Sequence, residues 1–150
     1  MSENNLKIIL ADDDEADRLL FKDAFVELKS KIAIETVNDG MELMDLLHAT
    51  DTPDLPQILF LDINMPQKTG IDCLKEIRAD KRFDDVAIAI YSTSSSEKDM
   101  DDTFLHGANV YIHKPNSFEK LKKVLGKAIM NYKVYQDPPF NKDNFILNAE

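Results

Sequence analysis

A short apolar run that ends in an aspartate constrains the fold of this chain more than any other stretch. Residues 58–61, Ile-Leu-Phe-Leu, are followed by Asp62 and are bounded by polar, proline-containing sequence. Four apolar residues are too few for a buried helix, so they favour a strand buried on both faces, as in a parallel sheet. Met65-Pro66 ends this strand, and residues 67–70 turn the chain. Asp62 is therefore predicted at the carboxyl end of the strand, where open α/β sheets bind their ligands.

Further short runs of apolar or β-branched residues predict the other strands. These runs cover residues 7–11, 32–37, 86–91 and 109–113. The segments that follow the strands repeat apolar residues at helical spacing, which predicts helices around 15–28, 41–47, 71–80, 97–106 and 118–132. Five strands that alternate with five helices through short connections indicate a doubly wound α/β fold around a five-stranded parallel sheet.

The length of 150 residues fits one domain, which we place at residues 1–135, with a C-terminal extension at 136–150. The extension contains two adjacent prolines and is expected to be irregular, yet it also carries apolar residues: Phe140, Phe145, Ile146 and Leu147. It is equally compatible with packing on its own domain and with packing on a partner. Cys73, the only cysteine, falls within a predicted helix and is expected to be a buried structural thiol.

The charge of the chain narrows the classes of partner. A formal net charge of -10 weighs against binding of nucleic acid, because phosphate contacts need clustered lysine and arginine. No apolar run approaches the ~18 residues of a membrane span, and the N-terminal residues lack a basic region followed by an apolar core. We therefore expect a cytoplasmic protein that binds neither membranes nor nucleic acid directly.

Four of the predicted strand ends carry chemically active side chains. Asp12 and Asp13 follow the first strand, Asp62 the third, Ser92 the fourth and Lys114 the fifth. Taken singly, the acidic run at Asp12, the serine at 92 and Lys114 are more simply a helix cap, a polar loop and a strand terminator, whereas Asp62 alone fits a cap and a functional carboxylate equally well. The carboxyl ends of parallel strands meet at one edge of the sheet, however, so these residues can converge. Three converging carboxylates repel one another unless a cation compensates, and an oxygen-only ligand set suits Mg²⁺.

A lysine and a hydroxyl beside such a metal site indicate that it binds an anion. A phosphoryl group is the anion most consistent with Mg²⁺ together with Lys114. Asp62 is then placed as a nucleophile that forms an acyl phosphate.

These residues resemble the receiver domain of two-component response regulators, the family of the bacterial chemotaxis regulator. The resemblance covers about residues 6–132. It rests on the acidic pair after the first strand, on Leu61-Asp62-Ile63-Asn64-Met65-Pro66 with Gly70, on Ser92 and on Lys114-Pro115. Asp62 precedes Ser92 by 30 positions and Lys114 by 52, spacings similar to those of the family. The resemblance implies a flavodoxin-like sheet with strand order 2-1-3-4-5.

The resemblance also implies roles for the acidic residues. Asp62 would be the phosphoacceptor, Asp13 a direct Mg²⁺ ligand and Asp12 a ligand through water. Asn64 would offer its backbone carbonyl to the metal.

Other roles concern the switch between two states. Ser92 would bond to the arriving phosphoryl group, and Tyr111 would turn inward when Ser92 moves. Lys114 would pair with the phosphoryl group, and the Lys114–Pro115 peptide bond would be cis. The family further implies a histidine kinase or histidine phosphotransfer protein as phosphoryl donor and a downstream protein target. Such a receiver catalyses only its own phosphorylation and dephosphorylation and is otherwise not an enzyme.

Some features depart from the family pattern or point to one branch of it. Thr93 stands where alanine or glycine is usual, and Asn116 replaces a common phenylalanine after Lys-Pro. The Ser92-Thr93-Ser94 run, the long last helix and the lack of an output domain are similar to stand-alone receivers of the bacteriophytochrome-associated type. A homodimer through the last helix or the apolar tail is a further hypothesis.

Two other functions share part of this pattern. A phosphatase of the haloacid dehalogenase type also uses an aspartyl nucleophile and Mg²⁺, but it needs a second aspartate two residues later, where this chain has Asn64. An inactive receiver-like interaction module would be expected to have lost part of the acidic set or the lysine, and this chain has both.

Overall fold

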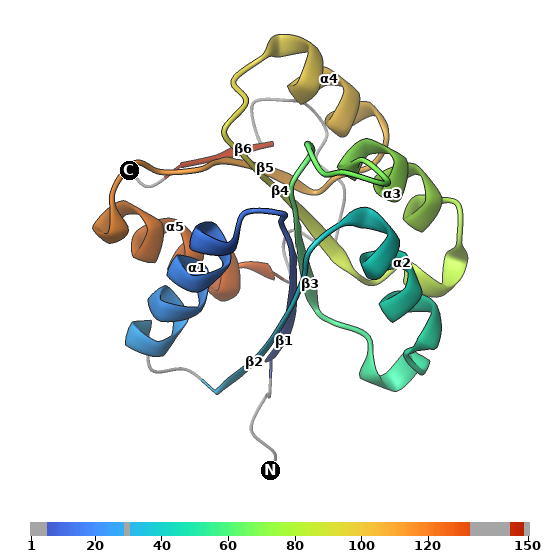
Figure 1. Ribbon diagram of the computed structural model, residues 1–150, viewed down its shortest axis with the longest axis horizontal. Coiled ribbons are helices and arrows are strands. Elements are labelled where there is room, and N and C mark those ends of the chain that lie inside the picture. The colour runs from blue at the N-terminus through green and yellow to red at the C-terminus, as the bar shows by residue number, and fades with distance from the viewer. Residues whose placement is uncertain (1–5, 29–30, 133–144, 149–150) are drawn as a thin grey trace.

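A parallel sheet with helices on both faces forms the molecule (Figure 1). The computed structural model describes residues 6–28, 31–132 and 145–148. The strands lie in the order β2-β1-β3-β4-β5-β6, with bounds β1 Leu6–Ala11, β2 Ile32–Val37, β3 Ile58–Leu61, β4 Ala87–Ser92, β5 Val110–His113 and β6 Ile146–Leu147. The first five strands confirm the predicted flavodoxin-like order 2-1-3-4-5.

The helices form two layers. They are α1 Glu15–Leu28, α2 Gly40–Ala49, α3 Gly70–Arg78, α4 Glu97–Leu105 and α5 Phe118–Met130, with short 3₁₀ turns at Thr52–Asp54 and Lys81–Phe83. Helices α1 and α5 cover one face of the sheet, and α2, α3 and α4 cover the other (Figure 1).

Alternation along β1 shows how the sheet separates two cores. Ile8 and Leu10 pack with Phe21 and Phe60 on the side of α1 and α5. Ile9 and Ala11 face the opposite core, which includes residues of α2 and α3. All four residues of β3 are buried, as expected for a central parallel strand.

Side-chain caps fix where the helices begin, and therefore how the loops leave the strands. The Asp14 carboxylate accepts the Asp17 N–H at the start of α1 (3.0 Å). Asp39, Thr69, Ser96 and Ser117 cap the four following helices in the same way. Each cap accepts an N–H that would otherwise lack a partner within the helix.

The C-terminal segment adds a sixth strand, which the sequence analysis did not foresee. Strand β6 pairs in parallel with β5, and the Tyr111 N–H donates to the Phe145 carbonyl (2.9 Å). The Phe145 side chain is fully buried, with an edge-on ring contact to Phe104 and a tilted ring contact to Tyr111. Of the two alternatives for the apolar tail, residues 145–148 therefore follow the first and pack on their own domain. The predicted boundary at residue 135 and Phe140 lie outside the described residues.

Cys73 is buried with its thiol against the Gly40 carbonyl, and burial raises the pKa of this thiol to about 11, which fits a structural cysteine. Within the described ranges, no helix combines the length and apolar character needed to cross a membrane.

Candidate functional site

The predicted site residues come together at the carboxyl edge of the sheet, where backbone hydrogen bonds fix their positions. The Asp12 N–H donates to the Val37 carbonyl (3.1 Å), which ties the end of β1 to β2. The Asp62 N–H donates to the Ala11 carbonyl (3.0 Å), which ties β3 to β1. The sheet register thus places Asp12 and Asp62 side by side although 50 positions separate them.

Asp12, Asp13 and Asp62 form a carboxylate cluster. One oxygen from each residue lies within 4.8 Å of the others. Asp12 is inaccessible to solvent, Asp62 is 6% exposed and Asp13 is exposed. Negative charges this close repel one another, most strongly between the buried Asp12 and Asp62, so the cluster favours a cation.

Lys114 supplies the cation that the protein itself brings to this cluster. Its Nζ atom lies 2.8 Å from Asp12 Oδ2 and 3.5 Å from Asp62 Oδ2, and its side chain is only 10% exposed. The backbone N–H of Lys114 donates to the Ser92 carbonyl (2.8 Å), which holds the end of β5 against β4. The ring of Tyr91 lies below the ammonium group, 5.3 Å from its centroid.

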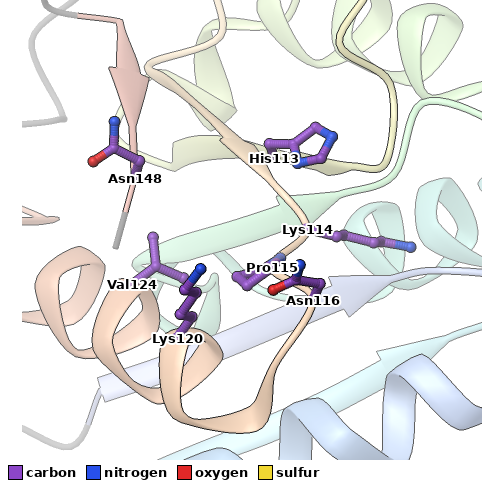
Figure 2. Close-up of a pocket in the computed structure, with 7 residues that line it drawn as sticks. All are labelled: His113, Lys114, Pro115, Asn116, Lys120, Val124 and Asn148. Atoms are coloured by element: carbon purple, nitrogen blue, oxygen red, sulfur yellow. The ribbon is translucent and has the colours of Figure 1, made fainter. Parts of the chain in front are cut away.

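The direction of the Lys114 side chain is visible in Figure 2. The lysine leaves the end of β5 and extends away from a neighbouring pocket, which is lined by His113, Lys114, Pro115, Asn116, Lys120, Val124 and Asn148. The ammonium group therefore pairs with the carboxylates of Asp12 and Asp62 and points away from this pocket.

The pKa values of Asp62, Asp12 and Lys114 reflect the excess of negative charge in this cluster. Burial raises the pKa of the Asp62 carboxyl to about 6, although the Lys114 charge acts in the opposite direction. Burial also raises the pKa of Asp12, again opposed by Lys114. Burial alone would lower the pKa of Lys114, but its close pairing with the carboxylates of Asp12 and Asp17 outweighs burial and raises it. One ammonium ion therefore does not compensate the carboxylates fully.

The donor atoms fit a hard divalent cation. Asp12 Oδ1 accepts the Asp14 N–H (2.9 Å), whereas Oδ2 is buried and pairs with the Lys114 charge without accepting a hydrogen bond. A buried carboxylate oxygen with unused lone pairs, beside two further carboxylates, is an arrangement that Mg²⁺ can complete. Asn64 donates its N–H to Asp62 Oδ1 (3.3 Å), which fixes the loop that carries its carbonyl.

Two further contacts shape the loop after β3. The Gly70 N–H donates to the Ile63 carbonyl (2.8 Å), and a Cβ atom on Gly70 would overlap the Asp62 carbonyl. Gln67 adopts a left-handed conformation (φ 69°) that reverses the chain between Pro66 and α3. Gly70 is therefore required by close backbone approach directly behind the candidate phosphoacceptor.

Ser92 and Tyr111 meet in the loop after β4. Ser92 is fully buried, and its Oγ accepts the Ser94 N–H (3.0 Å). The Tyr111 hydroxyl donates to the Ser94 carbonyl (2.8 Å). Burial raises the pKa of Tyr111, so its hydroxyl keeps the proton that it donates to Ser94. The structure shows Tyr111 only in this inward position, so its movement stays a prediction.

The expectation of a cis Lys114–Pro115 bond is wrong for this structure, whose described residues contain no cis peptide bond. Trans is the intrinsically favoured isomer even before proline. With the bond trans, the ammonium group of Lys114 lies next to the Asp12 carboxylate, and its backbone N–H donates to the Ser92 carbonyl.

Sequence reasoning missed one residue that reaches the site. Asp17, in the first turn of α1, lies with its Oδ2 atom 2.8 Å from Lys114 Nζ and bonds to it. An aspartate in the first turn of a helix is also explained by its favourable interaction with the helix N-terminus. Its closeness in the sequence to the acidic residues between β1 and α1 was the available signal.

The comparisons with known proteins agree with this geometry. The family model for the response regulator receiver domain matches residues 8–126. A chemotaxis protein CheY homologue of Campylobacter jejuni is 31% identical over 125 residues, which cover 81% of this chain and 93% of that protein.

Solved structures of response regulators superpose on the fold. The phosphorylated cyanobacterial phytochrome response regulator RcpA has a TM-score of 0.79 at 28% identity, covering 86% of this chain and 94% of RcpA. The Mn²⁺-bound form of the response regulator Rcp1 has a TM-score of 0.73 at 23% identity, covering 82% and 91%, and this likeness bears on the fold alone. With the strand order, the acidic cluster and the family match in agreement, the chain belongs to the family of response regulator receiver domains.

Proposed function

We propose that Asp62 is the phosphoacceptor of this receiver domain. The observation that supports this role is a buried carboxylate which lies at a strand end, within reach of two more carboxylates and one lysine. An Asp62 oxygen would attack the phosphorus of a phosphohistidine on a histidine kinase or phosphotransfer protein. The phosphorus–nitrogen bond breaks as the new oxygen–phosphorus bond forms, and the imidazole keeps the bonding electron pair.

We propose Mg²⁺ as the ion of the carboxylate cluster, held by Asp12, Asp13, Asp62 and the Asn64 backbone carbonyl. The unused Asp12 Oδ2 and the oxygen-only donor set support this assignment. When bound, the ion would neutralise charge on the phosphoryl oxygens and align them with Asp62.

Lys114 and Ser92 would stabilise the phosphorylated carboxylate. Lys114 is already within 3.5 Å of Asp62 Oδ2 and would pair with a phosphoryl oxygen. The Ser92 hydroxyl would donate to another phosphoryl oxygen. Because Ser92 and Tyr111 both contact Ser94, a shift of Ser92 would alter the β4–α4 loop and the setting of Tyr111.

The surface around α4, β5 and α5 is the one that such a shift would change, and we propose it as the surface read by a downstream protein target. A homodimer through α5 or the C-terminal segment is a separate proposal, which sedimentation with and without a phosphoryl mimic would test. The family match argues against a haloacid-dehalogenase-type phosphatase, because the chain is a signalling domain and Asn64 stands where that mechanism needs an acid.

The decisive experiment is incubation with a small phosphoryl donor such as acetyl phosphate and Mg²⁺, followed by intact mass measurement. We expect one added phosphoryl group, which is absent in Asp62→Asn and blocked by a chelator. Asp45→Asn, an exposed aspartate on α2, serves as the matched control and should be phosphorylated like the parent. Labelling that persists in Asp62→Asn, or rapid donor hydrolysis without accumulation, would contradict the proposal.

A further inference from the structure

The Lys114 ammonium group is shared by carboxylates from three different elements. Asp12 follows β1, Asp62 follows β3, and Asp17 belongs to α1. The ammonium nitrogen lies 2.8 Å from Asp17 Oδ2 and 3.5 Å from Asp62 Oδ2. Lys114 therefore pairs more closely with Asp17 than with the candidate phosphoacceptor.

The position of Asp17 is built into the start of α1. Its N–H is held by the Asp14 cap, and the neighbouring Arg18 donates from Nη1 to the Asp12 carbonyl (2.7 Å). These bonds tie the first turn of α1 to the end of β1. The Asp17 carboxylate, which is 31% exposed, is thus directed at Lys114 while lying outside the three-carboxylate cluster.

We propose that Asp17 is a positioning residue that holds Lys114 in a resting position and competes with the phosphoryl group for its charge. This inference rests on the proposed role of Asp62. A lysine has three N–H donors, and the carboxylates of Asp12 and Asp17 lie nearest to them. A phosphoryl group on Asp62 would need Lys114 to move toward it, and the accessible Asp17 pair is the one whose loss costs least. Asp17 thereby sets how readily the site accepts a phosphoryl group.

The test is the second-order rate constant for phosphorylation by acetyl phosphate in Mg²⁺, compared between the parent, Asp17→Asn and Asp17→Ala. We expect both substitutions to raise it by about three- to fivefold, the size expected for one partly exposed ion pair. Asp17→Glu keeps the charge within reach of Lys114 and should return the rate toward that of the parent. Asp23→Asn makes the same change of charge at an exposed position on α1 and should leave the rate unchanged.

The outcomes separate this inference from the proposed function. If the parent gains no phosphate, the role of Asp62 fails and the inference fails with it. If the parent is phosphorylated but Asp17→Asn and Asp17→Ala match it or react more slowly, only the inference is overturned. The same holds if Asp23→Asn speeds the reaction equally, or if Asp17→Glu is as fast as Asp17→Asn. Urea unfolding of each variant confirms that the compared proteins are folded.

Discussion

The ammonium nitrogen of Lys114 lies 2.8 Å from Oδ2 of Asp12, a carboxylate that solvent does not reach. This lysine is the protein's own counterion for a cluster that a divalent ion would otherwise neutralise. Lys114 and a metal ion therefore act on the same negative charge, so a change in one should alter the stabilising effect of the other.

Replacement of Lys114 by glutamine should destabilise the metal-free protein, because it leaves the carboxylates of Asp12 and Asp62 without a counterion. We expect a loss of about 2 kcal/mol in the free energy of unfolding at neutral pH, partly relieved by proton uptake. Added Mg²⁺ should stabilise Lys114→Gln more than it stabilises the parent. Urea unfolding with chelator and with Mg²⁺ measures both effects. Lys123→Gln, an exposed lysine on α5, is the matched control; weaker stabilisation of Lys114→Gln by Mg²⁺ would contradict this view.

The raised pKa of Asp62 predicts a pH-dependent penalty in the metal-free protein. Burial raises this pKa from 3.8 to about 6, so the folded state binds the proton more tightly than the unfolded state. Stability should then fall as pH rises from about 4 to above 6, by up to about 3 kcal/mol.

Asp62→Asn removes that ionisation and should be more stable than the parent at pH 7.5 in chelator. The advantage should shrink as the pH approaches 4 and should also shrink in Mg²⁺. Denaturant unfolding of both proteins across this pH range measures the difference. A constant difference at all pH values would show that Asp62 ionisation is not its source.

Gly70→Ala should distort the backbone that carries the phosphoacceptor. The new Cβ would overlap the Asp62 carbonyl and lie 2.8 Å from the Ile63 Cα atom. We expect a loss of about 2 kcal/mol or more in unfolding free energy, together with weaker Mg²⁺ stabilisation. Gly126→Ala, within helix α5, is the contrasting control. Its new Cβ would lie at an ordinary contact distance, 3.7 Å, from the Leu28 side chain of α1. That variant should gain about 0.5–1 kcal/mol in unfolding free energy from helix propensity. Equal effects of the two substitutions would contradict the close approach of Gly70 to the Asp62 carbonyl.

Phe145→Ala should loosen the contact between the C-terminal strand and β5. The reporter is the Tyr111 amide, which donates to the Phe145 carbonyl at 2.9 Å. Loss of the buried ring should speed hydrogen exchange at this amide by at least about tenfold. The Asp62 amide, bonded to Ala11 at the centre of the sheet, is the internal reference and should keep its protection. Unchanged exchange at Tyr111 would mean that the ring does not hold β6 in place.

The sequence predicted the strand-end residues because parallel register leaves little freedom there. A buried strand fixes where its last residue emerges, so the sequence alone predicts Asp12, Asp62 and Lys114 at one edge of the sheet. The ion pair between Asp17 and Lys114 could not be derived in this way. Its contact with Lys114 depends on how α1 packs over the sheet, and helix-dipole stabilisation explained the same residue equally well.

The C-terminal strand was missed for a different reason. Two residues, Ile146 and Leu147, are too few to show alternation, and their pairing with β5 spans a long stretch of sequence. Phe145 was recognised as too apolar for a linker, but no pattern indicated that Phe104 and Tyr111 would receive it. The sequence also could not decide whether the Lys114–Pro115 peptide bond is cis or trans, because a bond before proline can adopt either form.

The added strand also affects how the protein behaves toward other chains. Without β6, the outer side of β5 would present unpaired N–H and C=O groups next to uncovered aromatic rings, a combination that invites intermolecular strand pairing. A chain shortened before Phe145 should therefore tend to self-associate and precipitate, even with every residue of the phosphoryl site still in place.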